Sequence, residues 1–490
     1  MEEVRHYDRQ GSVGRQFLAS ILMSMASFCY GCCVGWLSPA LPTLRSPASP
    51  LGMALAPADE ALLASLLCLG AIAGTPVFGG IADKFGRKVA GLCSAVPFVL
   101  CWILKLSATS LPPMLAARVL AGAGGTGAML VAPLYAAEVS SPRCRGILGS
   151  IAVLAINAGI LFAYTVGAYT EYHTFLWILL AVPVAYFVCF LWMPETPIHL
   201  VKKGRDERAA EEIAWLRGLS IGHPAVDEVL AHIKRDQTLA NQSVLQLASI
   251  KEILFYPVTL KAFAVCFILI TFQGYIGMYA IMSYASDIFM EAGGSFSANT
   301  SAIILAAQQL CGSYASILLI ERIGRKLLLT ISAAVVSIGM TGLGTYLYMK
   351  EMGHDVSAFG WVPVSSLSLA VMVFSVGVGP VPFVITSEVF MVQVRGIATT
   401  IIIFWMWITA FMVSQFYSSI VACIGAYSTF WCFAAIALFG AIFTILFVPE
   451  TKGKRLEDIL TSFSSDFNYP RRERIPTNDD EEVKYANNIL

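Results

Sequence analysis

The hydrophobic residues of this chain are gathered in long runs that short polar segments separate. Residues 61–82, ALLASLLCLGAIAGTPVFGGIA, contain no charged side chain and are followed directly by the charged hexapeptide DKFGRK at 83–88. A run of about 20 apolar residues is long enough to cross a hydrocarbon core of about 30 Å, and in lipid a run of this length is a helix. The pattern predicts twelve membrane-spanning helices, at approximately 17–40, 61–82, 89–109, 114–138, 147–169, 175–193, 258–288, 298–320, 328–349, 362–388, 397–422 and 427–448.

The composition agrees with an all-α membrane protein. Hydrophobic residues make up 57% of the 490 residues and charged residues only 13%, against about 25% in soluble domains. The 32 basic and 32 acidic residues give a formal net charge of zero, so no basic surface for nucleic acid is expected.

The Lys and Arg residues are distributed very unevenly between the two sides of the predicted membrane domain. The leader, alternate connections and the tail after residue 450 together hold 28 of the 32. The exceptions are Arg45, Lys105, Arg118 and Lys350. Because basic loops stay on the cytosolic side, we expect both termini and the 194–257 connection in the cytosol.

Three short motifs occur twice in the same order. The charged hexapeptide returns as ERIGRK at 321–326, Glu-Val followed by Arg-Gly occurs at 138–146 and 388–396, and Pro-Glu-Thr occurs at 194–196 and 449–451. Two six-helix halves related by an axis along the membrane normal produce such a pattern, with the solute site at midplane between them. The predicted domains are a leader (1–16), an N-terminal half (17–193), a linker (194–257), a C-terminal half (258–449) and a tail (450–490). Within the linker, apolar residues at helical spacing between Val226 and Ile233 predict short amphipathic helices.

Other chemistries find no support in the sequence. Residues 122–127, GAGGTG, match a dinucleotide-binding pattern but lie inside an apolar run with no preceding strand. No nucleophile–base set, metal-ligand spacing or phosphate loop occurs, so we expect neither an enzyme nor a cofactor or metal. Arg118 is a charge inside a predicted span, which marks it as functional or structural.

Six segments together resemble one transporter family. They are GGIADKFGRK (79–88), PLYAAEVSSPRCRG (133–146), PETP (194–197), ERIGRK (321–326), GVGPVP (377–382) and PETKGKRLEDI (449–459). The set resembles the sugar porter family of the major facilitator superfamily, and within it most of all the facilitated glucose and trehalose carriers. The resemblance implies two pseudo-symmetric halves that rock about a central solute site, without a cofactor.

The recurring charges predict a gating network at the cytosolic helix ends. Its members are Asp83, Arg87, Glu138, Arg145 and Glu195 in the first half and Glu321, Arg325, Glu388, Arg395 and Glu450 in the second. Carboxylates and guanidinium groups at adjoining helix ends form charge-assisted hydrogen bonds that can latch one side of a carrier shut. The alternative is that these charges stay solvated and only set the topology.

Glycine and proline residues suggest where helices break or approach closely. Gly31 and Gly35 form a GxxxG pair in the first span, which allows close backbone packing. The tenth span is interrupted by four residues that we predict to act as a hinge, Gly377, Gly379, Pro380 and Pro382.

The resemblance also implies a set of substrate-binding residues. The candidates are Gln273, Tyr279, Gln309, Phe383 and Trp407. Gln273 and Trp407 match the family, whereas Tyr279 and Gln309 stand where it has Asn, and Phe383 where it has Trp. Five further positions, all of them polar in the family, are here Val153, Gly274, Ser375, Met406 and Ala410. These departures leave open whether the solute is a sugar or another small organic molecule.

The absence of one acid favours downhill transport. Proton-driven relatives place Asp in the first span where this chain has Cys33, and no midplane carboxylate replaces it. Asp287 and Glu291 fall near the outer end of the seventh span, where we expect them to line the entrance. The sequence therefore predicts a facilitative, monomeric sugar carrier of the plasma membrane, for trehalose or a hexose. A proton-coupled carrier, a carrier for a non-sugar solute and a non-transporting sensor on the same fold are the alternatives.

Overall fold

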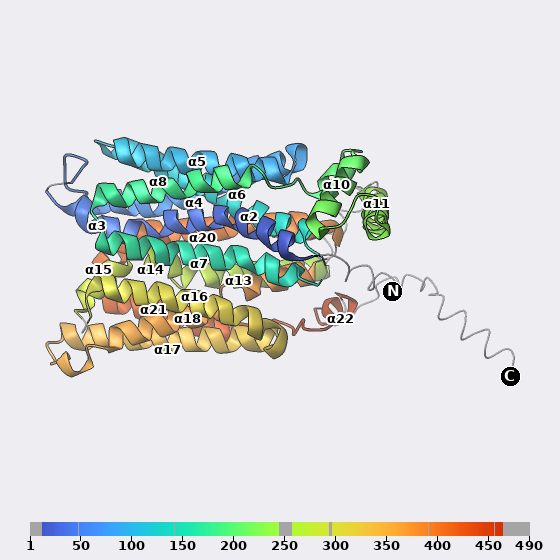
Figure 1. Cartoon of the computed structure of the whole chain (residues 1–490). Coiled ribbons are helices and arrows are strands. Elements are labelled where there is room, and N and C mark those ends of the chain that lie inside the picture. The colour runs from blue at the N-terminus through green and yellow to red at the C-terminus, as the bar shows by residue number, and fades with distance from the viewer. Residues whose placement is uncertain are drawn as a thin grey trace.

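The computed structural model describes residues 12–47, 49–141, 143–244, 257–293, 296–390, 392–454 and 456–463. Long helices run side by side in one bundle, and shorter helices lie beyond one end of it (Figure 1). We call the end that carries α10, α11 and α22 the linker end, and the opposite end, where α3 and α15 lie, the far end.

The first half contains six spans, as predicted. Its helices are α2 (Gly14–Gly35), α3 (Leu37–Arg45), α4 (Pro57–Phe85), α5 (Arg87–Ser107), α6 (Leu111–Val139), α7 (Arg145–Tyr169) and α8 (Tyr172–Phe190). Helices α2 and α3 together form the first span, Gly14–Arg45. The GAGGTG segment lies inside α6, so it belongs to a helix and not to a strand–helix turn.

The second half contains the other six spans, two of which are broken. Its helices are α13 (Pro257–Tyr275), α14 (Met278–Ser283), α15 (Ala285–Ala292), α16 (Ala298–Ile323), α17 (Arg325–Glu351), α18 (Val362–Val376), α19 (Val381–Val389), α20 (Val392–Ile424) and α21 (Ala426–Phe447). Gly277, at φ +91°, separates α13 from α14, a break that the sequence pattern did not predict. Three of the four predicted hinge residues, Gly377, Gly379 and Pro380, lie between α18, which ends at Val376, and α19, which begins at Val381. The fourth, Pro382, lies inside α19.

The two halves repeat the same packing. In the first half α2 packs on α7, α4 on α6, and α5 on α8. In the second half the corresponding pairs are α13 with α20, α16 with α18, and α17 with α21. Between the halves, α4 packs against α20 and α7 against α16. The duplicated motifs therefore reflect a duplicated architecture.

Glycine allows the closest helix contacts in the first half. A Cβ at Gly31 in α2 would collide with the backbone carbonyl of Ile156 in α7, and a Cβ at Gly159 in α7 would collide with that of Phe28. The close approach expected from the GxxxG pair is confirmed.

The linker forms three helices at the linker end of the bundle. They are α9 (Pro197–Lys202), α10 (Asp206–Arg217) and α11 (Pro224–Val244), and α22 (Leu456–Thr461) follows the second half. Ile213 and Ala214 of α10 pack against Val226 of α11, with Ile233 at the edge of the same small cluster. The structure thus has a helix over the predicted positions from Val226 to Ile233, while linker residues 245–256 lie outside the described part of the chain.

Candidate functional site

Arg87 is the centre of an ionic cluster at the linker end of the first half. Its Nε donates to Glu138 Oε1 of α6 at 2.9 Å, and its Nη1 lies 3.8 Å from Asp83 Oδ1, one turn back in sequence. Nη1 also donates to the carbonyl of Ala82 at 2.9 Å. The Arg87 side chain is almost fully buried, so these acceptors replace the water that the guanidinium loses.

Glu195 binds the beginning of α5 instead of an arginine side chain. Its carboxylate accepts the backbone N–H groups of Arg87 at 2.9 Å and Lys88 at 3.1 Å. The first N–H groups of a helix lack internal partners and carry the positive end of its dipole, so an anion is stabilised there. Gly86, at φ +106°, leaves room for this contact, because a Cβ at this position would collide with the Glu195 carboxylate. We call Asp83, Arg87, Glu138 and Glu195 the first-half cluster.

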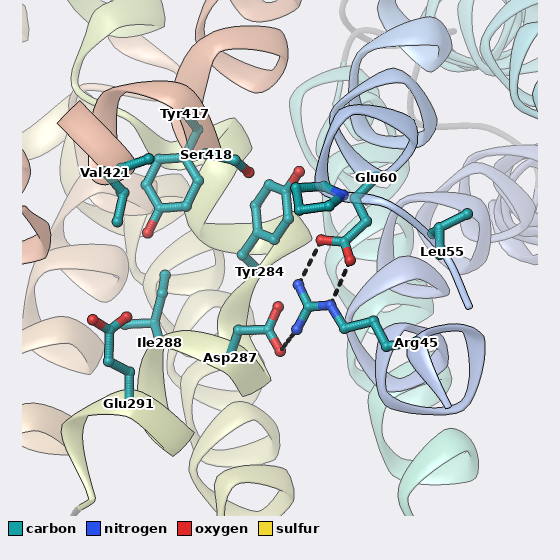
Figure 2. A pocket seen from close by; sticks show the side chains of 12 residues that line it. Arg45, Leu55, Glu60, Tyr284, Asp287, Ile288, Glu291, Tyr417, Ser418 and Val421 are labelled. Atoms are coloured by element: carbon teal, nitrogen blue, oxygen red, sulfur yellow. Dashed lines mark hydrogen bonds and ion pairs between the residues drawn. The ribbon is translucent and has the colours of Figure 1, made fainter. Parts of the chain in front are cut away.

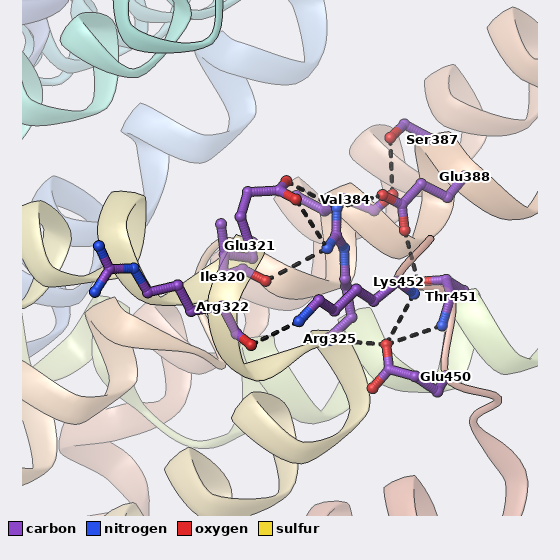
Figure 3. Close-up of polar contacts among 10 residues, drawn as sticks. All are labelled: Ile320, Glu321, Arg322, Arg325, Val384, Ser387, Glu388, Glu450, Thr451 and Lys452. Atoms are coloured by element: carbon purple, nitrogen blue, oxygen red, sulfur yellow. Dashed lines mark hydrogen bonds and ion pairs between the residues drawn. The ribbon is translucent and has the colours of Figure 1, made fainter. Parts of the chain in front are cut away.

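The second half repeats this arrangement around Arg325. Its Nη2 donates to Glu321 Oε1 and to Glu388 Oε1, both at 2.9 Å (Figure 3). Glu450 accepts the backbone N–H of Arg325 at 3.0 Å, and Gly324, at φ +100°, takes the place of Gly86. We call Glu321, Arg325, Glu388 and Glu450 the second-half cluster.

Glu450 has a lowered pKa in this environment. Burial acts to raise the pKa of its carboxyl, but four backbone N–H groups outweigh burial and hold it below its ordinary value. The donors are those of Lys452, Arg325, Lys326 and Thr451.

Two predicted members of the network stand apart from these clusters. The Arg145 side chain is exposed and makes no ion pair with any described residue. The side chain of Arg395 lies outside the described part of the structure. In the residues described, every ion pair of the two clusters stays within its own half, and none joins the halves at the linker end.

At the far end an ionic triad does join the halves. Arg45 of α3 donates to both oxygens of Glu60 in α4 at 2.6 Å, and to Asp287 Oδ1 of α15 at 2.9 Å. Asp287 belongs to the second half, so Arg45 bridges the seam. The sequence analysis identified Arg45 only as one of four basic residues outside the predicted cytosolic segments. That unusual position was the one sequence feature that could have indicated a role for Arg45.

Three uncharged contacts reinforce this junction across the seam. Ser38 Oγ lies 3.0 Å from Ser286 Oγ, Tyr164 Oη donates to the carbonyl of Met282 at 2.5 Å, and Ser65 Oγ donates to Gln415 Oε1 at 2.6 Å. The far end is therefore closed by contacts between the halves.

A cavity of about 500 Å³ lies beside the triad, between α3 and α4 of one half and α15 and α20 of the other (Figure 2). Asp287 and Glu291 line it, as expected for an entrance. The pKa of each carboxyl is raised, chiefly because burial disfavours the charged form.

The candidate solute-binding residues hold several unused polar groups near the middle of the bundle. Gln273 in α13 donates to the carbonyl of Gly379 at 2.8 Å, at the break between α18 and α19. Gln273 Oε1, Gln309 Oε1 and Trp407 Nε1 are buried without a hydrogen-bond partner in the described structure. Such groups are free to bind a polar solute.

The aromatic candidates lie around the same helices. Tyr30 of the first half meets Trp407 of α20 edge to face at 6.4 Å between ring centroids. Tyr279 in α14 and Phe383 in α19 are partly buried against the core. Sequence reasoning missed Asn157 of α7, which donates to Ser313 of α16 at 2.5 Å and so joins the halves at this level.

The structure accounts for some of the departures from the family pattern. Gly274 has no side chain because a Cβ there would collide with Thr409 of α20. The Ser375 hydroxyl donates a hydrogen bond to the carbonyl of Val371 at 3.0 Å. The side chain of Val153 is 49% exposed. Met406 and Ala410 are buried apolar residues.

Arg118 is buried in α6 among carbonyl groups. Its Nε donates to Leu63 O at 2.5 Å and its Nη1 to Cys33 O at 2.7 Å. Cys33 thus offers Arg118 a backbone oxygen, while its side chain adds no negative charge.

Comparisons with known proteins agree with this architecture. The chain is 34% identical over 446 residues to the facilitated trehalose transporter Tret1 of Polypedilum vanderplanki, covering 91% of this chain and 87% of that protein. It is 32% identical over 452 residues to the facilitated trehalose transporter Tret1 of Bombyx mori, covering 92% and 87%. The inward-open structure of the xylose transporter XylE from E. coli superposes with a TM-score of 0.75 at 21% identity, covering 92% of this chain and all of that one.

The fold is therefore the major facilitator fold, with twelve spanning helices in two six-helix halves. The family described as "Sugar (and other) transporter" matches residues 19–463, nearly the whole chain. The protein is a multi-pass integral membrane protein that belongs to this sugar transporter family.

Proposed function

We propose that this chain is a facilitative carrier that moves a sugar, trehalose or a hexose, down its gradient by alternating access. The two relatives named as facilitated trehalose transporters match it over nine tenths of its length. The buried, unpaired amide oxygens of Gln273 and Gln309 supply acceptors for sugar hydroxyls.

The surroundings of Arg118 carry the proposal that transport is not driven by protons. A coupling proton needs a carboxylate whose charge changes during the cycle, and such groups in a membrane sit beside a counter-charge. Arg118 donates to the carbonyls of Leu63 and Cys33, and no carboxylate of a described residue accepts from it.

The contacts between the halves suggest which state of the cycle is represented. At the far end, Arg45 and Asp287 hold the halves together, whereas the two clusters at the linker end stay within their own halves. An inward-open structure superposes on this chain with a TM-score of 0.75. We assign this structure to the state whose far end is closed, and opening that end requires the Arg45–Asp287 pair to break.

In this cycle the two clusters stabilise the packing of helices within each half. Arg87 ties α4, α5 and α6 together, and Arg325 does the same for the equivalent helices, so that each half moves as a rigid body. Arg145, which is exposed in this state, pairs with acids of the other half when the linker end closes. In this way the predicted latch involves Arg145. The break in the tenth span, formed by Gly377, Gly379 and Pro380 with Pro382 at the start of α19, absorbs the motion.

The distribution of Lys and Arg supports an orientation for this cycle. The linker end faces the cytosol together with both termini, and the far end faces outward across the plasma membrane. Residues 1–11 and 464–490 lie outside the described structure, so this orientation is carried by the charge count alone. One chain suffices for transport, because the path runs between its own two halves.

The test is uptake by the purified full chain in proteoliposomes, with labelled trehalose, glucose, fructose and a polyol. We expect trehalose or a hexose to equilibrate without accumulation, whether or not a proton gradient is imposed. Accumulation driven by the gradient would contradict the facilitative mechanism. Tight binding of a sugar with no uptake would instead identify a sensor, and uptake of the polyol alone a carrier for non-sugar solutes.

A further inference from the structure

The far-end cavity has its own lining, separate from the residues near the middle of the bundle. Its walls come from α3, α4, α15 and α20, and none of the midplane candidates Gln273, Gln309 and Trp407 belongs to them. Its volume of about 500 Å³ falls within the range of roughly 300–1,000 Å³ that small-molecule sites occupy.

One wall of this cavity is an aromatic surface. The rings of Tyr284, the residue before α15, and Tyr417 in α20 stack at 5.1 Å between centroids, with 28° between their planes. In Figure 2 the two rings lie next to each other, and Asp287, Ile288 and Glu291 of α15 lie beside them. Tyr417 also stacks on Phe433 and is only 8% exposed, so the open part of this aromatic wall is narrow and offers a contact for the apolar C–H groups of one small ring.

Hydrogen-bonding groups around this surface are not used within the protein. Asp287 Oδ2 is buried without a hydrogen-bond partner in the described structure, and the hydroxyl of Tyr284, a residue only 3% exposed, has only the Ser418 hydroxyl of the same cavity nearby. The Glu291 carboxylate makes no ion pair with a described residue, since Lys350 Nζ donates to the backbone carbonyl of Glu291. A buried oxygen such as Asp287 Oδ2 usually has a partner, which a solute or water would supply, whereas Glu291 is exposed at the rim and free to accept from a solute.

The charges of the cavity restrict the class of ligand. In the cavity lining three acids, Glu60, Asp287 and Glu291, outnumber the one cation, Arg45, and Lys350 lies near Glu291 outside the lining. This excess of acids disfavours an anion. Among the described residues there is no cluster of three potential ligands that could hold a metal ion. Carboxylates that accept from neighbouring hydroxyls, beside an aromatic face, suit a neutral polyhydroxylated ring.

We propose that this cavity is a second sugar-binding site at the outer mouth, which takes up the solute before the far end opens. The proposal rests on the proposed function and extends it, because it places one sugar outside the Arg45–Asp287 junction while the midplane site is still closed to that side. A second site of this kind raises the local concentration of solute at the gate.

Photo-crosslinking with a diazirine derivative of trehalose tests this directly. The full chain in proteoliposomes is labelled from the outside, and the adducts are located by peptide mass spectrometry. We expect adducts between 284 and 291 and between 417 and 422 that excess trehalose removes. Glu291→Gln and Tyr417→Leu should each reduce these adducts by about fivefold or more, the loss expected for one hydrogen bond to a charged group or one ring contact.

The controls separate the failure of this site from the failure of the proposed function. Glu351→Gln changes an exposed acid outside the cavity and should leave the adducts as in the unmodified chain. Because Glu291 is exposed on the cavity rim, its substitution does not threaten folding. If trehalose is taken up but adducts form only near Gln273 and Trp407, the second site is wrong and the proposed carrier function stands. If there is no sugar uptake and no adduct that trehalose removes, both proposals are wrong.

Discussion

Arg45 of the first half and Asp287 of the second are joined by an ion pair of 2.9 Å, although 242 residues separate them. Arg45 is also bound to both oxygens of Glu60 in its own half. At the opposite end, Arg87 and Arg325 form ion pairs only within their halves among the described residues. The single bridging guanidinium therefore makes the far end the place where the halves are ionically linked in this state.

Removing this link should make the far end open more often. Asp287→Asn keeps the shape of the side chain but removes its charge, and the partly exposed pair is worth about 1 kcal/mol, which corresponds to roughly a fivefold change in the population of the open state. The measurement is the rate at which an impermeant thiol reagent labels a cysteine introduced at Ser65, which is fully buried at the seam in this state and lies outside the far-end cavity. Asp59→Asn, at an acid without an ion pair in the described structure, is the matched control and should not change the rate. Equal labelling of Asp287→Asn and the unsubstituted reporter would show that Arg45 does not hold the seam.

Gly86 should be indispensable for the first-half cluster. Its φ of +106° strains any other residue, and a Cβ would displace the Glu195 carboxylate from the start of α5. We expect Gly86→Ala to cost about 1–3 kcal/mol of stability, measured as a lowered thermal unfolding temperature in detergent. Gly146→Ala is the control, because a Cβ there meets no atom and the backbone is helical. A normal unfolding temperature for Gly86→Ala would mean that Glu195 does not depend on this backbone shape.

The two clusters show what the sequence can and cannot predict. Arg87 and Arg325 could be identified because each recurs at the same place in a repeated motif, next to the end of an apolar run. A second repeated motif, Glu-Val followed by Arg-Gly, contains Arg145, which lies exposed and apart. Repetition reveals duplicated positions but not the conformation in which a side chain finds its partner. The pairing of Arg45 with Asp287 has no counterpart in the repeat, and hydropathy says nothing about contacts between distant spans.

The central residues illustrate a second limit. The resemblance located Gln273 and Trp407, but it could not explain the missing side chain at Gly274. Thr409, from a helix far away in sequence, fills that space. The break at Gly277 was equally hidden, because its apolar neighbours continue the hydrophobic run on both sides.

Restoring an acid beside Arg118 should introduce proton dependence. Cys33→Asp places a carboxylate in α2 near Arg118. The backbone carbonyl of residue 33 already accepts a hydrogen bond from Arg118 Nη1 at 2.7 Å. A buried carboxylate at this position would bind and release a proton as the carrier changes state. Sugar uptake should therefore vary with pH and respond to a proton gradient. Uptake by proteoliposomes between pH 5.5 and 8 measures this effect. Cys33→Asn provides an uncharged side chain of the same shape and should stay insensitive to the gradient; coupling in both variants, or in neither, would contradict the assigned role of the charge.

His199 should make the first-half cluster sensitive to acid. It is buried at the linker end, where its Nδ1 lies 3.5 Å from Arg87 Nη1. Burial lowers the pKa of His199, and Arg87, Lys203 and Lys202 lower it further, while Glu195 acts in the opposite direction. The folded chain thus binds this proton more weakly than the unfolded chain, whose His titrates near pH 6.5.

The sign of the pH dependence follows from that difference. Above about pH 6.5 His199 is neutral in both the folded and the unfolded chain, so it does not change the free energy of unfolding. As the pH falls below this value the unfolded chain binds the proton first, and the free energy of unfolding decreases. We expect the thermal unfolding temperature to fall between pH 7.5 and 5.5, and His199→Gln to reduce this fall. His232→Gln, at an exposed histidine paired with Asp236, should leave the pH profile unchanged. If His199→Gln and the unmodified chain lose the same stability on acidification, the proton responsible is bound elsewhere, and Arg87 is not destabilised through its histidine neighbour.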